Sequence, residues 1–331
     1  MRYLIVDTAN TFYRAKHAAS KHSNAWDKVG FAIHVTLASV NKAWRDQKAD
    51  HVVFCLEGRS WRKDFYAPYK ANRAVARAAL TEAEQEEEEL FWEAYANMVK
   101  FVTERTNCTT LQHDNLEADD LIAGWIQSHP NDSHTIISTD SDYHQLLATN
   151  VKQFNGVTEE LHTLDGIFDK RNKIIIDKKT KEPKKIPDPK YILFEKCMRG
   201  DSSDNVFSAY PGVYSKSTKN KVGLLEAYGD RDKGGYSWNN LMLQKWVDHN
   251  DVEHKVIDDY NRNVTLIDLT AQPEDIKTKI TETIANGSVV LERPMIGIQF
   301  LKFCGKYDLV KLSDHAAEYA RWLSASYTNL I

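Results

Sequence analysis

Three carboxylates, Glu117, Asp119 and Asp120, stand within four positions of the stretch LQHDNLEADDLIAGW. Glu117 and Asp120 are three residues apart, so they share one face of a helix, and an apolar helical pattern follows them. Acidic residues are also favoured in the first turn of a helix, where they offset the positive end of the helix dipole. The stretch predicts the start of a helix, and by itself it leaves open whether the three acids also do chemistry.

Three further acids each follow a short apolar run with the length of a buried strand. The runs and their acids are YLIV before Asp7, HVVFCL before Glu57, and HTIIST before Asp140, with Asp142 two positions later. In open α/β sheets, ligands bind in the crevice beyond the carboxyl ends of the strands. We therefore expect Asp7, Glu57 and Asp140 to share one crevice, with the acids of LQHDNLEADDLIAGW at the same edge.

A fourth acidic motif, RGDSSDNV, supplies Asp201 and Asp204, which are spaced so that both side chains can face one way. A turn followed by a helix cap explains the same letters, because Asp, Ser and Asn favour both turns and caps. Taken alone, this motif favours the cap over a ligand role.

Nine carboxylates are thus candidates for one site: Asp7, Glu57, Glu117, Asp119, Asp120, Asp140, Asp142, Asp201 and Asp204. Two like charges about 4 Å apart repel by roughly 1 kcal/mol in water and roughly 4 kcal/mol at an effective dielectric near 20, so such a cluster is costly without cations. Oxygen ligands with no paired His or Cys suit a hard ion such as Mg²⁺ or Mn²⁺. Two ions about 3.5–4 Å apart could serve in-line displacement on a phosphodiester, so the acids point to phosphoryl transfer.

The elements that position these acids follow from the hydrophobic pattern. The first half alternates short apolar runs with longer helical patterns, which is typical of a parallel sheet with crossover helices. From about residue 188 the pattern becomes helical, and there is no internal repeat. The sequence therefore predicts an α/β core over residues 1–187 and a helical region over residues 188–331.

The composition is that of a soluble globular protein with 331 residues, of which 42% are hydrophobic. Its four cysteines are far apart and form no C-x-x-C pair, which argues against a disulfide framework or a zinc site and favours a reducing cytosol. The N-terminal MRYLIVDTAN has too short an apolar run for a secretory signal, and no stretch approaches 18 apolar residues. We therefore expect a cytoplasmic protein without a membrane span.

The net charge of −4 hides an uneven distribution. Residues 169–190 carry nine Lys and Arg against four Asp and Glu, and they predict a hairpin or extended loop that is either solvated or bound to phosphate. Residues 82–89 hold six glutamates, which most simply make a solvated helical face.

Five motifs occur in an order that resembles the flap endonuclease, or 5′-3′ exonuclease, family. They are YLIVD, VVFCLE with RKDFYAPYKANR, EADDLIA, STDSDYHQLL and GDSSDNV. The likeness is greatest to the phage ribonuclease H type and covers about residues 1–310, since NRNVTLIDL and RPMIGIQFLKFCGKYDL also resemble its C-terminal helices. The resemblance implies a PIN-like nuclease core with a mostly parallel sheet flanked by helices, a helical arch and a helical C-terminal DNA-binding region.

By this resemblance, the acids would form two metal sites. The first would comprise Asp7, Glu57, Asp119 and Asp120, with Glu117 nearby, and the second Asp140, Asp142, Asp201 and Asp204. Lys70 and Arg73 match the family's basic pair at the base of an arch that admits a 5′ single strand and that residues 74–105 would build. The residues expected to act in catalysis are Asp7, Glu57, Asp120, Asp140, Lys70 and Arg73. Without the resemblance, Lys70 and Arg73 would be assigned to a solvated loop.

The sequence departs from the family pattern in two places. Glu57 stands where an Asp is usual, which would shift the metal or make the contact through water. The helix-hairpin-helix turn reads YPGVYSKSTKNK, in which Gly212 remains but Tyr214 replaces the second glycine. DNA contacts through this divergent turn would then fall to its lysines, which are Lys216, Lys219 and Lys221.

The resemblance implies a structure-dependent 5′ nuclease that uses Mg²⁺, with Mn²⁺ as a substitute, in DNA replication or repair. Its substrates would be DNA with a 5′ end or flap and RNA–DNA hybrids, and its partners a polymerase or a single-strand DNA-binding protein. We expect a monomer, located in the host cytoplasm if the protein is phage-encoded. Two alternatives stay open: a Toprim-like enzyme using Glu57, Asp140 and Asp142, and a protein that binds branched or single-stranded DNA without cutting it.

Overall fold

The computed structural model describes residues 1–18, 24–211, 223–248 and 250–328. The chain divides into two compact units. Unit 1 comprises Met1–Arg59, Leu80–Ile186 and Lys277–Ile331, and unit 2 comprises Ser60–Ala79 and Pro187–Ile276. The division expected from the sequence, 1–187 and 188–331, differs from this one in two segments: residues 60–79 group with unit 2, and residues 277–331 return to unit 1.

Unit 1 is built on a seven-stranded sheet with the strand order β3-β2-β1-β4-β5-β6-β7. The strands are β1 (Arg2–Asp7), β2 (His51–Cys55), β3 (Thr109–Leu111), β4 (Ser133–Ile137), β5 (Val151–Asn155), β6 (Glu160–His162) and β7 (Ile167–Phe168). The first five strands pair in parallel, and β6 and β7 add an antiparallel edge. The predicted mostly parallel α/β sheet is confirmed.

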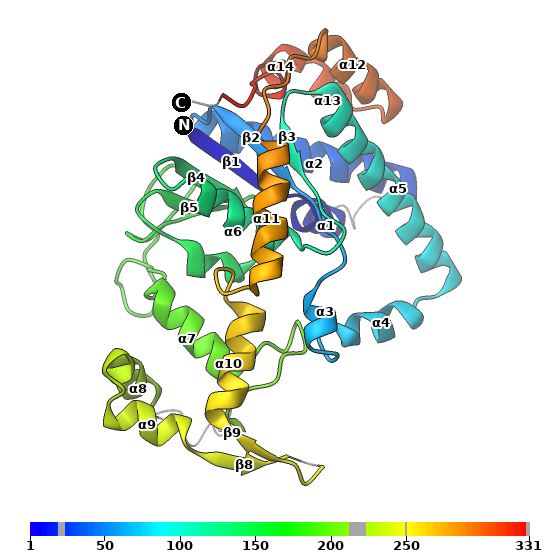
Figure 1. Ribbon diagram of the computed structural model, residues 1–331. Coiled ribbons are helices and arrows are strands. Elements are labelled where there is room, and N and C mark those ends of the chain that lie inside the picture. Colours follow the sequence, from blue (N-terminus) through cyan, green and yellow to red (C-terminus); the bar gives the residue numbers. More distant parts are fainter. Residues whose placement is uncertain (19–23, 212–222, 249, 329–331) are drawn as a thin grey trace. The chain divides into compact units, whose positions relative to one another are not determined.

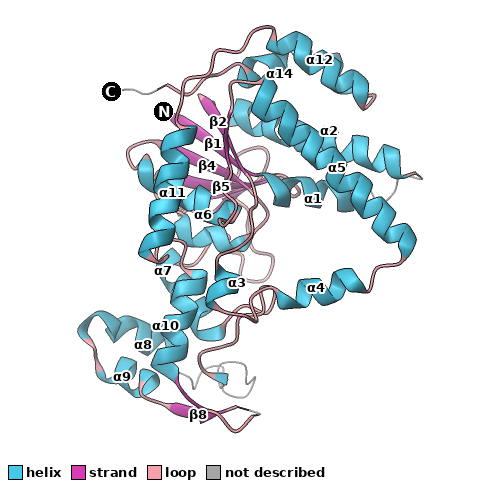
Figure 2. Ribbon diagram, turned by 45° about the vertical axis from the view of Figure 1, so that its right-hand side comes forward, coloured by secondary structure: helices cyan, strands magenta, loops and turns pink. Residues whose placement is uncertain are grey.

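Helices cover both faces of this sheet (Figure 2). The helices of unit 1 are α1 (Thr8–Ala18), α2 (Ala25–Asp46), α5 (Glu82–Arg105), α6 (Ala118–Ser128), α11 (Glu274–Gly287), α12 (Ile296–Lys306), α13 (Val310–Ser313) and α14 (Ala316–Leu323), together with the 3₁₀ helix η2 (Ser141–Leu146). Because both faces are covered, the central strands are continuous apolar runs, and β1 is buried from its second residue to its last.

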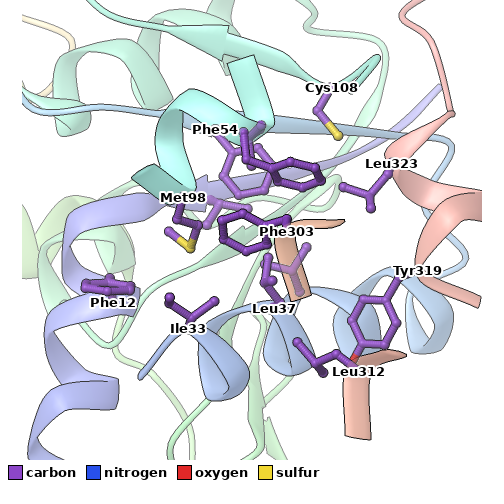
Figure 3. Packing of buried hydrophobic residues seen from close by; sticks show 14 of the residues in the cluster. Phe12, Ile33, Leu37, Phe54, Met98, Cys108, Phe303, Leu312, Tyr319 and Leu323 are labelled. Atoms are coloured by element: carbon purple, nitrogen blue, oxygen red, sulfur yellow. The ribbon is translucent and has the colours of Figure 1, made fainter. Parts of the chain in front are cut away.

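Alternate side chains of β1 and β2 face two different layers. Leu4 and Phe54 belong to the main core. Figure 3 shows Phe54 there among side chains of α2, α5 and the C-terminal helices. Tyr3 points to the other face, where its ring meets the buried Trp125 of α6 edge to face at 5.2 Å. The sheet is therefore fixed from both sides, which gives the strand ends a rigid support.

Helix α5 has two different halves. Thr81 and Glu84 form a capping box at its start. Of the six glutamates in residues 82–89, four are exposed, as expected for a solvated face, whereas Glu87 and Glu88 are half-buried. From Phe91 onwards one side of the helix is buried in the core of unit 1. The proposed arch over residues 74–105 would include this helix and α4 (Ala71–Ala78), and it stays a prediction.

In its described residues, unit 2 is helical apart from one short hairpin, in agreement with the predicted helical C-terminal region. Its elements are α3 (Arg62–Phe65), α4, α7 (Pro189–Arg199), α8 (Leu224–Asp230), the 3₁₀ helix η5 (Arg231–Lys233), α9 (Tyr236–Met242), β8 (Lys245–Val247), β9 (Glu253–Lys255) and α10 (Val256–Ile267). Arg62 is buried there, and its Nε donates to the carbonyl of Leu266 at 2.8 Å. The predicted DNA-contacting lysines Lys216, Lys219 and Lys221, together with Tyr214, lie outside the described residues.

The basic segment 169–190 is largely exposed and extended. After β7 it forms isolated antiparallel bridges between Phe168 and Ile174 and between Ile176 and Pro183. This is the hairpin-like loop that the sequence predicts; its binding to phosphate remains a prediction. Within the described residues, no helix is long and apolar enough to cross a membrane.

His51, at the start of β2, makes the stability of unit 1 depend on pH. Its Nδ1 lies 2.8 Å from the carbonyl oxygen of Ala325, which only accepts, so Nδ1 carries the proton and Nε2 accepts from Thr109 Oγ1 at 2.8 Å. Burial lowers the pKa of His51 to about 4, well below its ordinary 6.5. The unfolded chain therefore binds a proton at a higher pH than the folded chain does.

We expect His51 to destabilise the fold as the pH falls from its unfolded pKa of 6.5 to its folded pKa of about 4. The loss reaches at most about 3 kcal/mol and is absent above this window. Thermal melts between pH 7 and pH 4 should show a smaller pH dependence for His51→Gln than for the wild type. His315→Gln, at an exposed position, is the control and should keep the wild-type slope. Equal slopes for all three proteins would exclude this role of His51.

Candidate active site

Strands β2, β1 and β4 are parallel neighbours (Figure 1), so three acids at or just after their ends lie at one edge of the sheet. Asp7 is the last residue of β1 and lies opposite Cys55, the last residue of β2, while Val6 lies opposite Ile137, the last residue of β4. Glu57 and Asp140 follow the ends of β2 and β4 within a few residues. The structure thus brings Asp7, Glu57 and Asp140 to the same carboxyl edge.

Helix α6 begins at this edge and supplies the next acids. Its N-cap is Glu117, whose backbone N–H donates to Asp120 Oδ2 at 3.1 Å in a capping box, and Asp120 is completely buried. Glu57 Oε2 accepts from the backbone N–H of Ala118 at 3.2 Å. The predicted helix start is therefore confirmed, with Asp119 and Asp120 in the first turn, and Glu57 is tied to the same helix start.

Two of the acids converge on Tyr143, a fully buried residue of η2. Its hydroxyl donates to Asp7 Oδ2 at 3.1 Å and also makes a hydrogen bond with Asp119 Oδ1. Asp7 Oδ2 accepts a second bond, from Ser138 Oγ at 2.9 Å. A phenol carries one proton, so it cannot donate fully to both carboxylates at once.

The electrostatics of this edge follow from burial and crowded negative charge. Burial raises the pKa of Asp7 to about 6, and the charge of Asp140 acts in the same direction against the hydrogen bonds that lower it. Burial also raises the pKa of the Cys55 thiol, and the charges of Asp7, Asp119 and Glu57 raise it further. Asp140 therefore lies close enough to act on Asp7, and Asp7, Asp119 and Glu57 all lie close enough to act on Cys55.

Asp140 and Asp142 are held by a local turn. Asp140 Oδ1 accepts from the backbone N–H of Asp142 at 2.9 Å and so caps η2, while the Asp140 N–H donates to Ser138 Oγ at 3.0 Å. Gln153 of β5 donates to the Asp140 carbonyl oxygen at 2.6 Å. Ser138 thus connects Asp140 to Asp7.

Asp201 and Asp204 belong to unit 2, where cations of the same unit neutralise both. Asp201 Oδ2 lies 2.8 Å from Lys196 Nζ, and Asp201 Oδ1 accepts from the backbone N–H and the hydroxyl of Ser203. Burial opposes ionisation of Asp201, but the Lys196 charge and these hydrogen bonds bring its pKa down to about 2. The turn expected for this motif is therefore present, but no helix begins within residues 201–210, so the expected helix cap is wrong.

The predicted basic pair is bonded to Asp204. Arg73 donates to Asp204 Oδ1 at 2.7 Å, Lys70 Nζ lies 3.5 Å from Oδ2, and the Tyr69 hydroxyl donates to Oδ2 at 3.0 Å. Lys70 stands at the start of α4 with a left-handed backbone, and its N–H donates to the Asp204 carbonyl at 2.8 Å. Lys70, Arg73 and Asp204 form one cluster inside unit 2, and a joint site of all nine acids stays a proposal.

The donor set of unit 1 fits a hard divalent cation. It consists of carboxylate oxygens, and two of them, from Asp7 and Asp119, bond to the same Tyr143 hydroxyl. Tyr95 is within reach of the same acids: burial raises its pKa most, and the charges of Glu57 and Asp7 raise it further. Its buried hydroxyl has no hydrogen-bond partner among the described residues. In the described part of the chain no three His, Cys, Asp or Glu side chains are grouped closely enough to hold an ion as they stand. Binding would therefore require carboxylates to turn from their present partners.

Sequence reasoning missed Tyr143, Ser138 and Gly58. Tyr143 and Ser138 lie beside the predicted acids in HTIISTDSDYHQLL, but an aromatic in a helical pattern and a serine after a strand are both ordinary. Gly58 follows Glu57 directly, and a Cβ there would lie 2.0 Å from the carbonyl oxygen of His113. A glycine immediately after a strand-end acid was the one available signal of this close approach.

The family follows from comparison with known proteins. Residues 2–178 match the model of the 5′-3′ exonuclease N-terminal resolvase-like domain, and the chain belongs to this family. It is 26% identical over 328 residues to DNA polymerase I of Rhizobium leguminosarum, covering 95% of this chain and 28% of the polymerase. It is also 26% identical to the flap endonuclease of Escherichia phage T5, with 69% of this chain and 70% of that protein covered.

A further relative and a solved structure agree with this family. The 5′-3′ exonuclease of Aquifex aeolicus is 27% identical, with 69% of each chain covered. The crystal structure of the T5 D15 protein, which was co-crystallised with metal ions, matches with a TM-score of 0.58 and 21% identity over 87% of this chain and all of that one. This structural similarity supports the fold. The chain spans little more than a quarter of the Rhizobium polymerase that it matches.

Proposed function

We propose that this chain is a structure-dependent 5′ nuclease that hydrolyses phosphodiester bonds of DNA in replication or repair. The observation that carries the proposal is the convergence of acids from β1, β2, β4 and α6 at one edge of a resolvase-like sheet. Relatives named flap endonuclease and 5′-3′ exonuclease support the same reaction class. The full set of clustered acids disfavours a protein that only binds DNA, because uncompensated carboxylates repel a phosphate backbone.

The proposal includes divalent metal ions, with Mg²⁺ as the natural ion and Mn²⁺ as a substitute. The ligands at the sheet edge would come from Asp7, Glu57, Glu117, Asp119, Asp120, Asp140 and Asp142, and Asp201 and Asp204 of unit 2 would complete the second site. Bound there, the ions would supply a nucleophilic water and neutralise charge on the phosphate. The chain itself supplies the support: Ser138 orients Asp7 and Asp140, and the start of α6 orients Glu57. The T5 D15 flap endonuclease has been crystallised with DNA and metal ions.

The proposed substrates are DNA with a free 5′ end or flap and RNA–DNA hybrids. A monomer working in the cytoplasm beside a polymerase or a single-strand DNA-binding protein fits this function. This chain is similar to a part, 28%, of DNA polymerase I of Rhizobium leguminosarum, and this similarity supports a polymerase as the partner.

Cleavage of a labelled substrate panel tests the function. The panel comprises a 5′ flap, a nicked duplex, a blunt duplex and an RNA–DNA hybrid, each with Mg²⁺ and with EDTA. We expect Mg²⁺-dependent cutting that requires a 5′ end. Binding without cutting would favour the DNA-binding alternative, and strand passage or primer synthesis would favour the Toprim-like one.

Lys70→Ala tests the catalytic role of the basic pair. A cation positioned at the phosphate stabilises the negative charge that develops in the transition state. We expect the single-turnover rate at saturating DNA to fall at least about 10-fold, or roughly 1.4 kcal/mol, with a smaller effect on affinity.

The matched control is Lys63→Ala, which removes an exposed lysine of α3 in the same unit. It should retain the wild-type rate. If Lys70→Ala and Arg73→Ala lose affinity but keep near-normal saturating rates, the pair only holds the substrate and the catalytic role is wrong.

A further inference from the structure

We propose that the Tyr143 hydroxyl is a positioning group that holds Asp7 and Asp119 for a divalent cation at the sheet edge. This inference rests on the proposed metal-dependent nuclease and adds a residue to its site. Tyr143 comes from η2, Asp7 from the end of β1 and Asp119 from the first turn of α6. One side chain therefore links the three elements that deliver the acids.

The contact is buried and specific. Tyr143 has no exposed surface, and Asp7 is 4% exposed, so the phenol and the carboxylate cannot exchange their bond for one to bulk water. The hydroxyl meets Asp7 Oδ2 at 3.1 Å and bonds to Asp119 Oδ1. A buried polar group without such partners is costly, so the hydroxyl and the two carboxylates constrain each other's positions.

The arrangement leaves a need for positive charge. The single phenolic proton serves one carboxylate at a time, and the other then faces a lone pair of the same oxygen. Because both carboxylates bond to the same buried oxygen, their negative charges lie close together and repel each other. A divalent cation bound by these carboxylates would offset this repulsion, with the tyrosine hydroxyl orienting the ligand oxygens. Partners of this kind typically contribute 10–100-fold to metal affinity.

A purely structural role would have a different signature. If Tyr143 only anchored η2, removing its hydroxyl would lower stability without altering metal affinity. Tyr143→Phe separates the two roles, because it keeps the ring in the core and removes only the hydroxyl. Tyr319→Phe is the matched control, since Tyr319 is another buried tyrosine of unit 1, on α14, outside the proposed site.

The experiment measures Mn²⁺ affinity of the full chain by calorimetry without DNA, together with thermal melts in EDTA. We expect Tyr143→Phe to bind Mn²⁺ about 10–100-fold more weakly than the wild type, and Tyr319→Phe to bind it equally well. Tyr143→Phe should also need a higher Mn²⁺ concentration for half-maximal cleavage. Its cleavage rate at saturating Mn²⁺ should fall by a smaller factor.

Unchanged Mn²⁺ affinity in Tyr143→Phe would overturn the inference even if its melting temperature fell. If Tyr143→Phe does not fold, Asp119→Asn is compared with Asp119→Asn/Tyr143→Phe. Tyr143 still bonds to Asp7 in that background, so equal Mn²⁺ affinities of the pair would also overturn it. The proposed function fails separately, because it predicts that the wild type binds Mn²⁺ and cuts DNA with a 5′ end.

Discussion

Asp140→Asn is expected to lower the single-turnover cleavage rate by more than about 100-fold. Losing a residue that only orients a metal ligand already lowers metal affinity or activity by about 10–100-fold. Asp140 is proposed as a ligand itself, so its loss should cost more. Asn keeps the Oδ1 that accepts from the Asp142 N–H, and Asn is as good a cap as Asp, so η2 should form unchanged. The variant therefore removes one charge from the edge without removing its local support.

Three measurements make this result specific to the site. DNA affinity in EDTA should stay near the wild-type value, and the melting temperature in EDTA should be equal or higher, because one repelling charge is gone. Asp314→Asn, which changes an exposed aspartate at the end of α13, should cut normally. Normal turnover by Asp140→Asn would refute the proposed site.

Gly58→Ala is expected to destabilise unit 1 by about 3 kcal/mol, or roughly 6–12 °C in melting temperature. The new Cβ would lie 2.0 Å from the His113 carbonyl oxygen, 2.8 Å from that of Leu116 and 2.9 Å from that of Asp114. All three are backbone atoms, so no side-chain rotation relieves the overlap. The same segments are joined by the hydrogen bond from Gly58 N–H to Leu116 O at 2.9 Å.

The substitution should also reduce cleavage, because Gly58 directly follows Glu57 and the opposing segment leads into Glu117 and α6. Gly305→Ala is the matched control in unit 1. Gly305 lies in α12 with open space around its Cβ position, so alanine should be neutral or stabilising by up to about 1 kcal/mol. A Gly58→Ala protein that melts with the wild type would show that this close approach is not a constraint.

The sequence by itself determined the mostly parallel sheet and the position of Asp7, Glu57 and Asp140 at or just after the ends of strands. Both follow from local causes: apolar runs of strand length alternate with helical patterns, and the acids follow those runs directly. The start of α6 was readable for the same reason, because acids favoured in a first helical turn stand directly before an apolar helical pattern.

Only the tertiary structure decided which residues meet across the chain. The order β2-β1-β4 brings Glu57, Asp7 and Asp140 together, and the apolar runs would equally suit other orders. Tyr143 lies 136 positions from Asp7, and Asp204 lies 131 from Arg73. Neither pairing has a local signal in the sequence. Hydrophobic periodicity and capping act between near neighbours, whereas these contacts depend on how packed elements place side chains that are far apart in sequence.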